Sequence, residues 1–217
     1  MKILPKPKEN FMNEILKRVS SYGDGYEFSA ETYMDDFDSI VRKLLEDFEI
    51  KTVPIPIEEI YRRLGIKLVE LDFVALGKQE DVLGYIVAKA DNLLQDGEEY
   101  SVAAAVRDSD PHVRKRYTAA HELYHAIRDM LPRLQVSGTS ASFVRALSTD
   151  SQPSERIANE FAARILIPTD IIKAEFDKMS GGSVREMADK FGVSPSNMVE
   201  RLTKQGFAEH VTNSLGG

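Results

Sequence analysis

The chain of 217 residues contains no cysteine and only four histidines. Without cysteine there is no disulfide framework and no thiolate metal site, so histidine and carboxylate side chains remain as metal ligands. No stretch approaches the roughly 18 consecutive apolar residues of a membrane-spanning helix. The N-terminus also lacks the apolar core of about 7–15 residues that marks a signal peptide. We therefore expect a cytoplasmic protein that does not engage a membrane.

Positive charge is also scarce, since 28 Lys and Arg face 35 Asp and Glu, which gives a net charge of −7 and a pI near 5.2. Proteins that bind nucleic acid non-specifically are usually basic, so direct nucleic-acid binding is not expected. A hydrophobic content of 42% is ordinary for a folded protein of this length. The length itself indicates one domain with small appendages.

The segment RYTAAHELYHAIRDM, residues 116–130, contains the motif H-E-x-x-H and favours a helix closed by Pro132. Residues four apart on a helix lie on one face, with Cβ atoms roughly 5–6 Å apart. His121 and His125 can therefore converge on one zinc ion. Glu122 flanks that ion without being a ligand, so it can accept a proton from water. With so few histidines, the motif arises by chance with odds of roughly 1 in 100.

A second helix is predicted at residues 154–166, and we nominate it as the source of the third ligand. Glu155 supplies a carboxylate, and Asn159, one turn further on the same face, can hold the distal N–H of a ligand histidine. Alternatively, Glu155 is only an N-terminal glutamate that the helix dipole favours. Beside the H-E-x-x-H motif, we prefer the ligand interpretation.

The remaining pattern predicts an α+β fold in which helices pack on a small, mostly antiparallel, three-stranded sheet. Helices are expected within residues 2–23, after Ser29, and at 54–64, and strands at 66–73, 84–88 and 100–106. Residues 91–99 would connect the last two strands as a hairpin. Residues 132–153 are rich in Ser and Thr, with at most a short turn at 143–147, and are either a lid or a surface excursion.

Two further helices, at 183–191 and 195–205, are separated by a glycine turn and have the order of a helix-turn-helix. Ser194 and Pro195 form a clear helix start, and Gly206 a clear stop. Residues 181–217 carry four positive and four negative side chains, so this segment has no net positive charge that would support DNA binding. We therefore favour a structural or protein-contact role for this pair over DNA readout.

Taken together, RYTAAHELYHAI at 116–127 and ERIANEFAARILIP at 155–168 resemble the ImmA/IrrE family of metallopeptidases. The stretches at 54–71 and 183–207 are also similar to that family. The resemblance implies a zincin-like core in which His121, His125 and Glu155 bind Zn²⁺ and Glu122 is the general base. The resemblance covers roughly residues 52–207. We therefore expect an N-terminal helical extension at 1–50 outside it, the core at 51–180 and a C-terminal helical part at 181–217.

The resemblance also implies a zinc endopeptidase that cleaves a helix-turn-helix transcriptional repressor in a stress or mobile-element response. The alternative is a metal-bound regulatory module that binds a repressor or DNA without proteolysis. Tyr124 departs from the family, where a small residue is common, and would alter the cleft near His125. The donor that stabilises the oxyanion is left open among six side chains: Arg116, Tyr117, Tyr124, Arg128, His112 and His210.

Overall fold

The computed structural model describes residues 30–75, 84–88, 102–127, 144–146, 153–178 and 183–207. The predicted helix within 2–23, the Ser29 cap and the 91–99 connection lie outside these residues. The described part contains seven helices and four strands, in the order α2 (Ala30–Asp47), α3 (Ile57–Arg63), β1 (Lys67–Leu71), β2 (Gly84–Ala88), β3 (Val102–Arg107), α4 (His112–His125), β4 (Val144–Ala146), α6 (Pro153–Leu166), α7 (Thr169–Lys178), α8 (Val184–Phe191) and α9 (Pro195–Lys204).

The four strands form one mixed sheet in the order β1-β3-β2-β4. Strands β1 and β3 are parallel, whereas β2 is antiparallel to both β3 and β4. The α+β class is confirmed, but the prediction of three strands is wrong, because the turn expected at 143–147 is strand β4. A three-residue strand is too short to show the alternation that marks a strand in a sequence. Its partner β2 is also far away in the chain.

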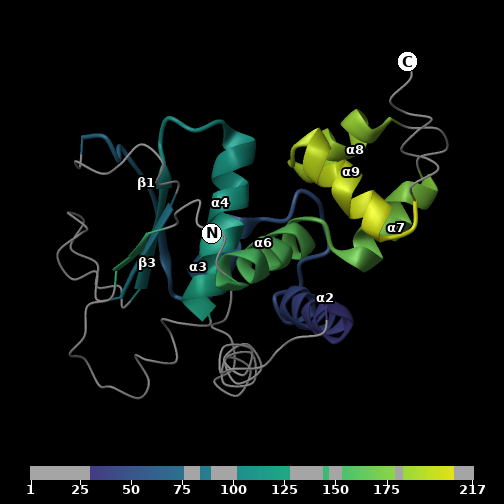
Figure 1. Cartoon of the computed structure of the whole chain (residues 1–217), viewed down its shortest axis with the longest axis horizontal. Coiled ribbons are helices and arrows are strands. Elements are labelled where there is room, and N and C mark those ends of the chain that lie inside the picture. Colours follow the sequence, from purple (N-terminus) through teal and green to yellow (C-terminus); the bar gives the residue numbers. More distant parts are fainter. Residues whose placement is uncertain are drawn as a thin grey trace.

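The helices that the structure describes lie on one side of the sheet, with α4 next to it and α7, α8 and α9 furthest away (Figure 1). Helix α4 packs on β3 and β2 because their facing side chains are small or aliphatic, as at Ala104 and Ile86. Among the described residues, the opposite face of the sheet carries a small apolar cluster around Phe73 and Ala105. The main core therefore lies between the sheet and the helices, and α4 runs through it.

Short-range sequence signals account for several helix ends. Ser194 caps α9 ahead of Pro195, as predicted. Ser183 and Glu186 form a reciprocal capping box at the start of α8, which was not predicted. Gly65 and Gly192 adopt left-handed backbone angles after α3 and α8. Glycine takes such angles without steric strain, so it ends both helices cleanly.

Helix α2 is part of the main core, since its apolar face is buried with the side chains of α4 and α6. This face consists of Ile40, Val41, Leu44 and Leu45, and Phe48 follows it directly after the helix. The core also includes residues of α8 and α9, so the domain boundaries at 50 and 180 stay a prediction. Within the ranges that the structure describes, no helix is long and apolar enough to cross a membrane.

A buried ionic cluster joins α2 to α6 and α9. Arg164 and Arg201 are each only 2% exposed, and both approach Asp38, at 3.4 Å and 3.1 Å. Burial, followed by the nearby charge of Arg164, lowers the pKa of Arg201, and Asp38 opposes that shift. Arg201 also donates to the Ile167 carbonyl at 3.1 Å. Because Asp38 is shared by two buried guanidinium groups, it holds three helices together.

We predict that Asp38→Ala lowers the free energy of unfolding by about 3 kcal/mol, because two buried cations lose their shared carboxylate. Asp170→Ala is the matched control, because its ion pair with Arg42 is more than half exposed, at 59% and 52%. This control should lose at most about 1 kcal/mol. Urea unfolding of the two variants measures both values, and equal losses would contradict the structural role of Asp38.

Candidate metal centre

Helix α4 presents the two histidines of the motif from one face. His121 and His125 are each 1% exposed, and their Nε2 atoms lie 3.2 Å apart. The helix begins at His112, earlier than predicted, directly after Pro111, and residues 128–130 lie outside the described residues. Because the two nitrogens point to the same place, they form one half of a ligand set.

Helix α6 completes the set from the opposite side, and its predicted range is confirmed to within one residue. Glu155 Oε2 lies 3.0 Å from His121 Nε2, and Glu155 Oε1 lies 3.6 Å from His125 Nε2. The small, fully buried Ala120 on α4 and Ala158 and Ala162 on α6 let the two backbones approach closely. The three side chains form the one potential metal-binding cluster found among the described residues.

The spacing of these atoms fits a tetrahedral zinc ion. Zinc bonds of about 2.0–2.1 Å place any two tetrahedral ligands roughly 3.4 Å apart. The three separations of 3.2, 3.0 and 3.6 Å lie around that value. Two imidazoles and one carboxylate are also a common donor set for catalytic zinc, with the fourth position left for water or substrate. The cluster therefore has both the chemistry and the dimensions of such a site.

Asn159 contacts the far side of His121, as its position one turn after Glu155 led us to expect. Its Oδ1 lies 2.9 Å from His121 Nδ1. A carbonyl oxygen only accepts hydrogen bonds, so Nδ1 carries the proton and donates. With Nδ1 bonded to Asn159, Nε2 is the ring atom that faces Glu155 and His125, where a cation would lie.

Glu122 is 1% exposed and faces strand β2 rather than helix α6. A Cβ atom added at Gly84 would lie 2.6 Å from Glu122 Oε1 and 2.7 Å from Thr118 Cγ2. Only glycine at this position lets the strand cover the carboxylate so closely. Sequence analysis missed Gly84, although a glycine at the start of a predicted strand is a recognised sign of close backbone approach.

Tyr61 of α3 supports the same region of α4. Its hydroxyl donates to the Ala119 carbonyl at 2.8 Å. Burial, and then the charge of Glu122, raise the pKa of Tyr61 well above its usual value. The hydroxyl therefore stays protonated beside Glu122 and remains a donor to the helix backbone.

Tyr124 does not shape a cleft, although its bulk suggested that it would. The side chain is fully buried in an aromatic cluster with Phe37 of α2 and Phe161 of α6, at ring distances of 6.1 and 5.7 Å. Its ring also lies edge-on to the His125 ring, 5.4 Å away. Tyr124 therefore supports His125 from within the core.

Arg116 is excluded as an oxyanion donor by its contacts. Its guanidinium donates to the carbonyls of Ile55, at 2.8 Å, and Gly192, at 3.2 Å. These bonds tie the start of α4 to the segment before α3 and to the turn after α8. A side chain at Gly192 would crowd Arg116 Nε at 3.0 Å, so the glycine serves this contact as well as the turn.

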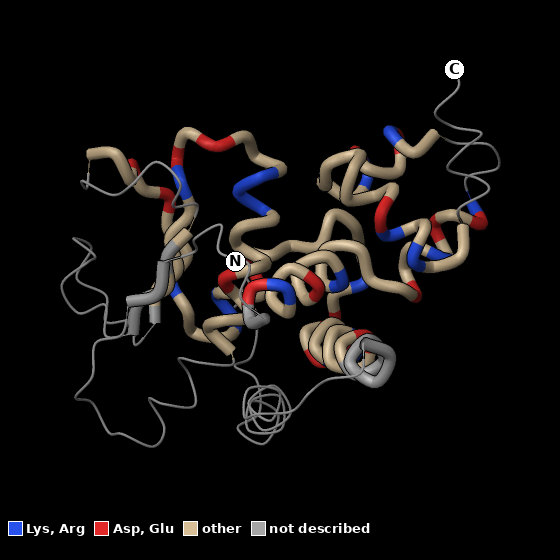
Figure 2. The backbone as a smooth tube through the Cα atoms, in the orientation of Figure 1, with Lys and Arg blue, Asp and Glu red and all other residues tan. Residues whose placement is uncertain are grey.

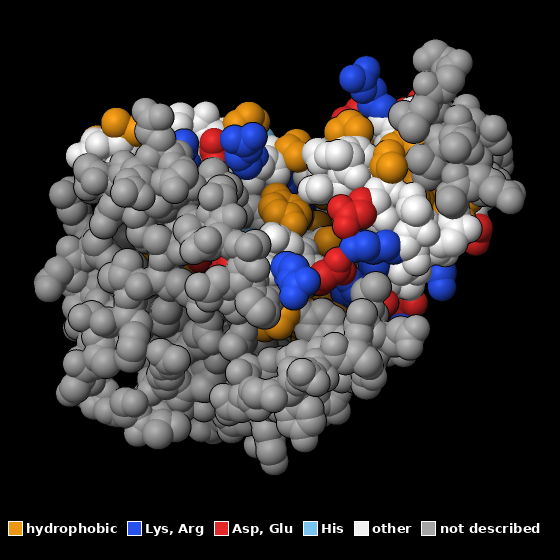
Figure 3. Space-filling view, viewed as in Figure 1, with side chains coloured by type: hydrophobic (Ala, Val, Ile, Leu, Met, Phe, Trp, Pro, Cys, Tyr) orange, Lys and Arg blue, Asp and Glu red, His pale blue; other side chains and the backbone are white. Residues whose placement is uncertain are grey.

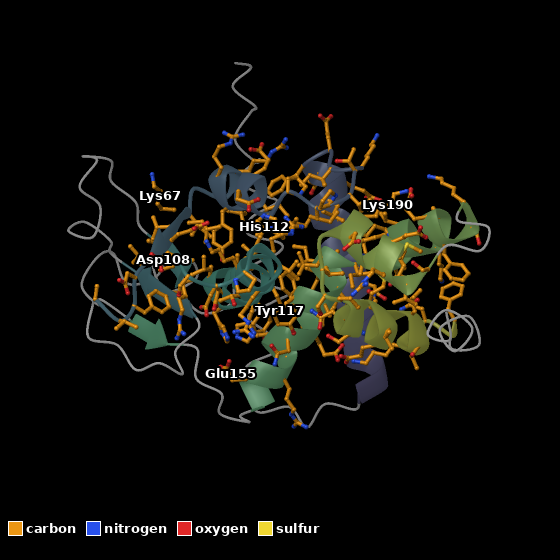
Figure 4. All side chains as sticks on the ribbon, turned by 90° about the horizontal axis from the view of Figure 1, so that it is seen from above. Lys67, Asp108, His112, Tyr117, Glu155 and Lys190 are labelled. Atoms are coloured by element: carbon orange, nitrogen blue, oxygen red, sulfur yellow. The ribbon has the colours of Figure 1, made fainter. Side chains whose placement is uncertain are left out.

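Two other candidates also lie elsewhere. His112 lines a cavity of about 430 Å³ between α3, β1 and the start of α4. Figure 4 shows Tyr117 between His112 and Glu155, so His112 is at the end of α4 that is remote from the ligands. The Tyr117 hydroxyl contacts Asn159 instead. Arg128 and His210 lie outside the described residues, so the oxyanion donor is not among the four candidates that the structure describes.

Fold and site together define a two-histidine, one-carboxylate metal centre of the H-E-x-x-H type. The M78 peptidase family, whose sequence model is described as the IrrE N-terminal-like domain, matches residues 62–203, and the chain belongs to this family. Comparison with curated proteins gives no match. Among solved structures, a Mycobacterium tuberculosis transcriptional regulator is similar, with 16% sequence identity and a TM-score of 0.47. The match covers 89% of this chain and 51% of the regulator, so the chain spans about half of that protein's length.

We predict that three alanine variants on α6 weaken zinc binding in a fixed order. Glu155→Ala removes a ligand and should lower the affinity by more than about 100-fold, whereas Asn159→Ala should lower it roughly 10–100-fold. Glu160→Ala is the control, because Glu160 pairs with Arg164 and Lys204 and not with the cluster. Competition with a chelator measures the order. Release of zinc by Glu160→Ala but not by Glu155→Ala would refute the ligand assignment.

Proposed function

We propose that this protein is a zinc-dependent endopeptidase. The observation that carries the proposal is the convergence of His121, His125 and Glu155 around one point, with Glu122 next to the first ligand on the same helix. Membership of the M78 peptidase family supports it independently, because the family match rests on sequence and not on the geometry of the cluster.

The proposed roles follow from the positions of the side chains. Bound zinc would lower the pKa of a water molecule and polarise the peptide carbonyl. Glu122 accepts the proton of the attacking water and passes it to the leaving amine, as a general base and then a general acid. His121, held by Asn159, and His125, backed by Tyr124, keep their nitrogens aimed at the metal. Strand β2 at Gly84 keeps the Glu122 carboxylate from turning away.

For the substrate we propose a helix-turn-helix transcriptional repressor, on the basis of the resemblance to the ImmA/IrrE family. A protein substrate also agrees with the charge of the chain. On α8 and α9 positive and negative residues are interspersed along the backbone (Figure 2). Arg201, one of the four positive residues there, is buried against Asp38. The helix pair therefore presents no basic surface for a phosphate backbone.

We predict that the zinc-loaded protein cleaves its cognate repressor, taken as the helix-turn-helix protein encoded next to it, into discrete fragments. Glu122→Gln should retain zinc, because Glu122 is not a ligand, and should lose activity by about 10²–10⁴-fold, because an amide cannot accept the proton. Fragments are measured by mass spectrometry and zinc by elemental analysis. Binding of the repressor without fragments would support the alternative of a regulatory module, and loss of zinc from Glu122→Gln would refute the assigned role.

We predict that Gly84→Ala separates the positioning of Glu122 from metal binding. The added methyl group must displace the Glu122 carboxylate or the strand. A displacement of about 1 Å at a reacting group lowers the rate by roughly 100-fold. The zinc affinity should change by no more than a few-fold, since the three atoms nearest to the new one belong to Glu122 and Thr118 and not to a ligand. Full activity of Gly84→Ala would show that the close approach has no role in catalysis.

A further inference from the structure

Tyr117 lies on α4 one turn before His121, and its hydroxyl reaches across to α6. The oxygen is 3.3 Å from Asn159 Oδ1 and 3.4 Å from the Asn159 backbone carbonyl. Because α4 and α6 run in opposite directions, Tyr117 faces Asn159 one turn away from the place where His121 faces Glu155. The hydroxyl is therefore connected to the metal centre through Asn159, without touching a ligand itself.

We propose that Tyr117 is a positioning residue of the metal centre. It orients Asn159 and thereby holds the His121 ring with Nδ1 toward Asn159 and Nε2 toward the metal site. This inference rests on the proposed zinc site. The Asn159 Oδ1 atom accepts from two sides, from the Tyr117 hydroxyl and from His121 Nδ1. Two donors that converge on one atom favour its being the oxygen, so the amide cannot turn its NH₂ group toward His121.

The two contacts of Asn159 Oδ1 differ in length, and this difference sets the expected loss of zinc affinity when the Tyr117 hydroxyl is removed. The contact with His121 Nδ1, at 2.9 Å, has the usual length of a hydrogen bond. The contact with Tyr117, at 3.3 Å, is longer than the typical 2.7–2.8 Å or so of a bond between two oxygens. The hydroxyl should therefore matter less to the metal than Asn159 does, and should act only while Asn159 is present.

The surroundings of Tyr117 keep its hydroxyl a donor. Burial, and then the charges of Glu200 and Glu160, raise the pKa of Tyr117 to about 12. Tyr117, Glu160 and Glu200 line a cavity of about 240 Å³ between α4, α6 and α9. Loss of the hydroxyl therefore leaves space at an existing cavity and creates no clash. On the surface over and beside α6, positive and negative side chains lie next to one another (Figure 3).

A double-mutant cycle on zinc affinity tests the proposal, with Tyr117→Phe, Asn159→Ala and the double variant. Tyr117→Phe removes one oxygen atom and should weaken zinc binding about three- to tenfold, less than the roughly 10–100-fold expected for Asn159→Ala. In the Asn159→Ala background, Tyr117→Phe should have no further effect, because the group through which it acts is gone. Thr203→Val is the control, since it also removes a hydroxyl that donates to a backbone carbonyl, that of Val199 on α9, and not to Asn159. This control should leave the affinity unchanged.

The Nδ1 proton of His121 gives a second readout that reports directly on the contact with Asn159. In the zinc-loaded protein Nε2 would bind the metal, so the ring proton lies on Nδ1 and is detected by ¹H–¹⁵N NMR. Tyr117→Phe should shift the resonance of this proton, because Asn159 is no longer held from its other side.

The proposal requires both results. Three outcomes would each overturn it. The zinc affinity of Tyr117→Phe could equal that of wild type, or its effect could add fully to that of Asn159→Ala. The NMR signal of the His121 ring could also be the same in wild type and Tyr117→Phe. If wild type binds no zinc, the proposed function fails first. If wild type binds zinc tightly while Tyr117→Phe behaves like wild type, only the role of Tyr117 fails.

Discussion

The close antiparallel packing of α4 on α6 is the contact on which the rest of the structure depends. Each helix alone carries an incomplete ligand set, with two histidines on α4 and one carboxylate on α6. Alanines at the interface, such as Ala120 and Ala158, bring the two backbones near enough for Glu155 to reach His121 at 3.0 Å. Larger side chains there would separate the ligands beyond the roughly 3.4 Å spacing that zinc requires.

Other elements hold this helix pair in place. On one side, β2 covers Glu122 at Gly84, and Tyr61 bonds to the α4 backbone. On the other side, Phe37 of α2 packs on Tyr124, and its neighbour Asp38 joins the buried arginines of α6 and α9. Helix α2 precedes the matched family region of 62–203, yet it contacts the side chains that support the metal centre. Tyr124 has a packing partner, Phe37, in that helix.

How much could be predicted from the sequence depended on the range of the interactions. The pairing of His121 with His125 follows from helical spacing, and the caps at Ser183 and Ser194 follow from local hydrogen bonds. Local pattern also placed Glu155 and Asn159 on one helix face. Their contact with His121, however, joins residues more than 30 positions apart in the chain. Helix spacing cannot predict such a contact, and the expectation came from the family resemblance.

The features that were missed all arise from long-range packing. The parallel pairing of β1 with β3 and the addition of β4 depend on which strands become neighbours, and the strand sequences do not encode this. The approach of Gly84 to Glu122, the burial of Arg201 against Asp38 and the aromatic partners of Tyr124 each join distant segments. An exposed arginine and a buried, paired arginine look the same in a sequence.

The most direct test of the central claim is a crystal structure of the zinc-loaded protein with anomalous diffraction measured at the zinc edge. The account predicts one anomalous peak between α4 and α6, about 2.0–2.2 Å from His121 Nε2, His125 Nε2 and a Glu155 carboxylate oxygen. A peak that lies elsewhere, or a zinc ion held by the two histidines while Glu155 points away, would contradict it.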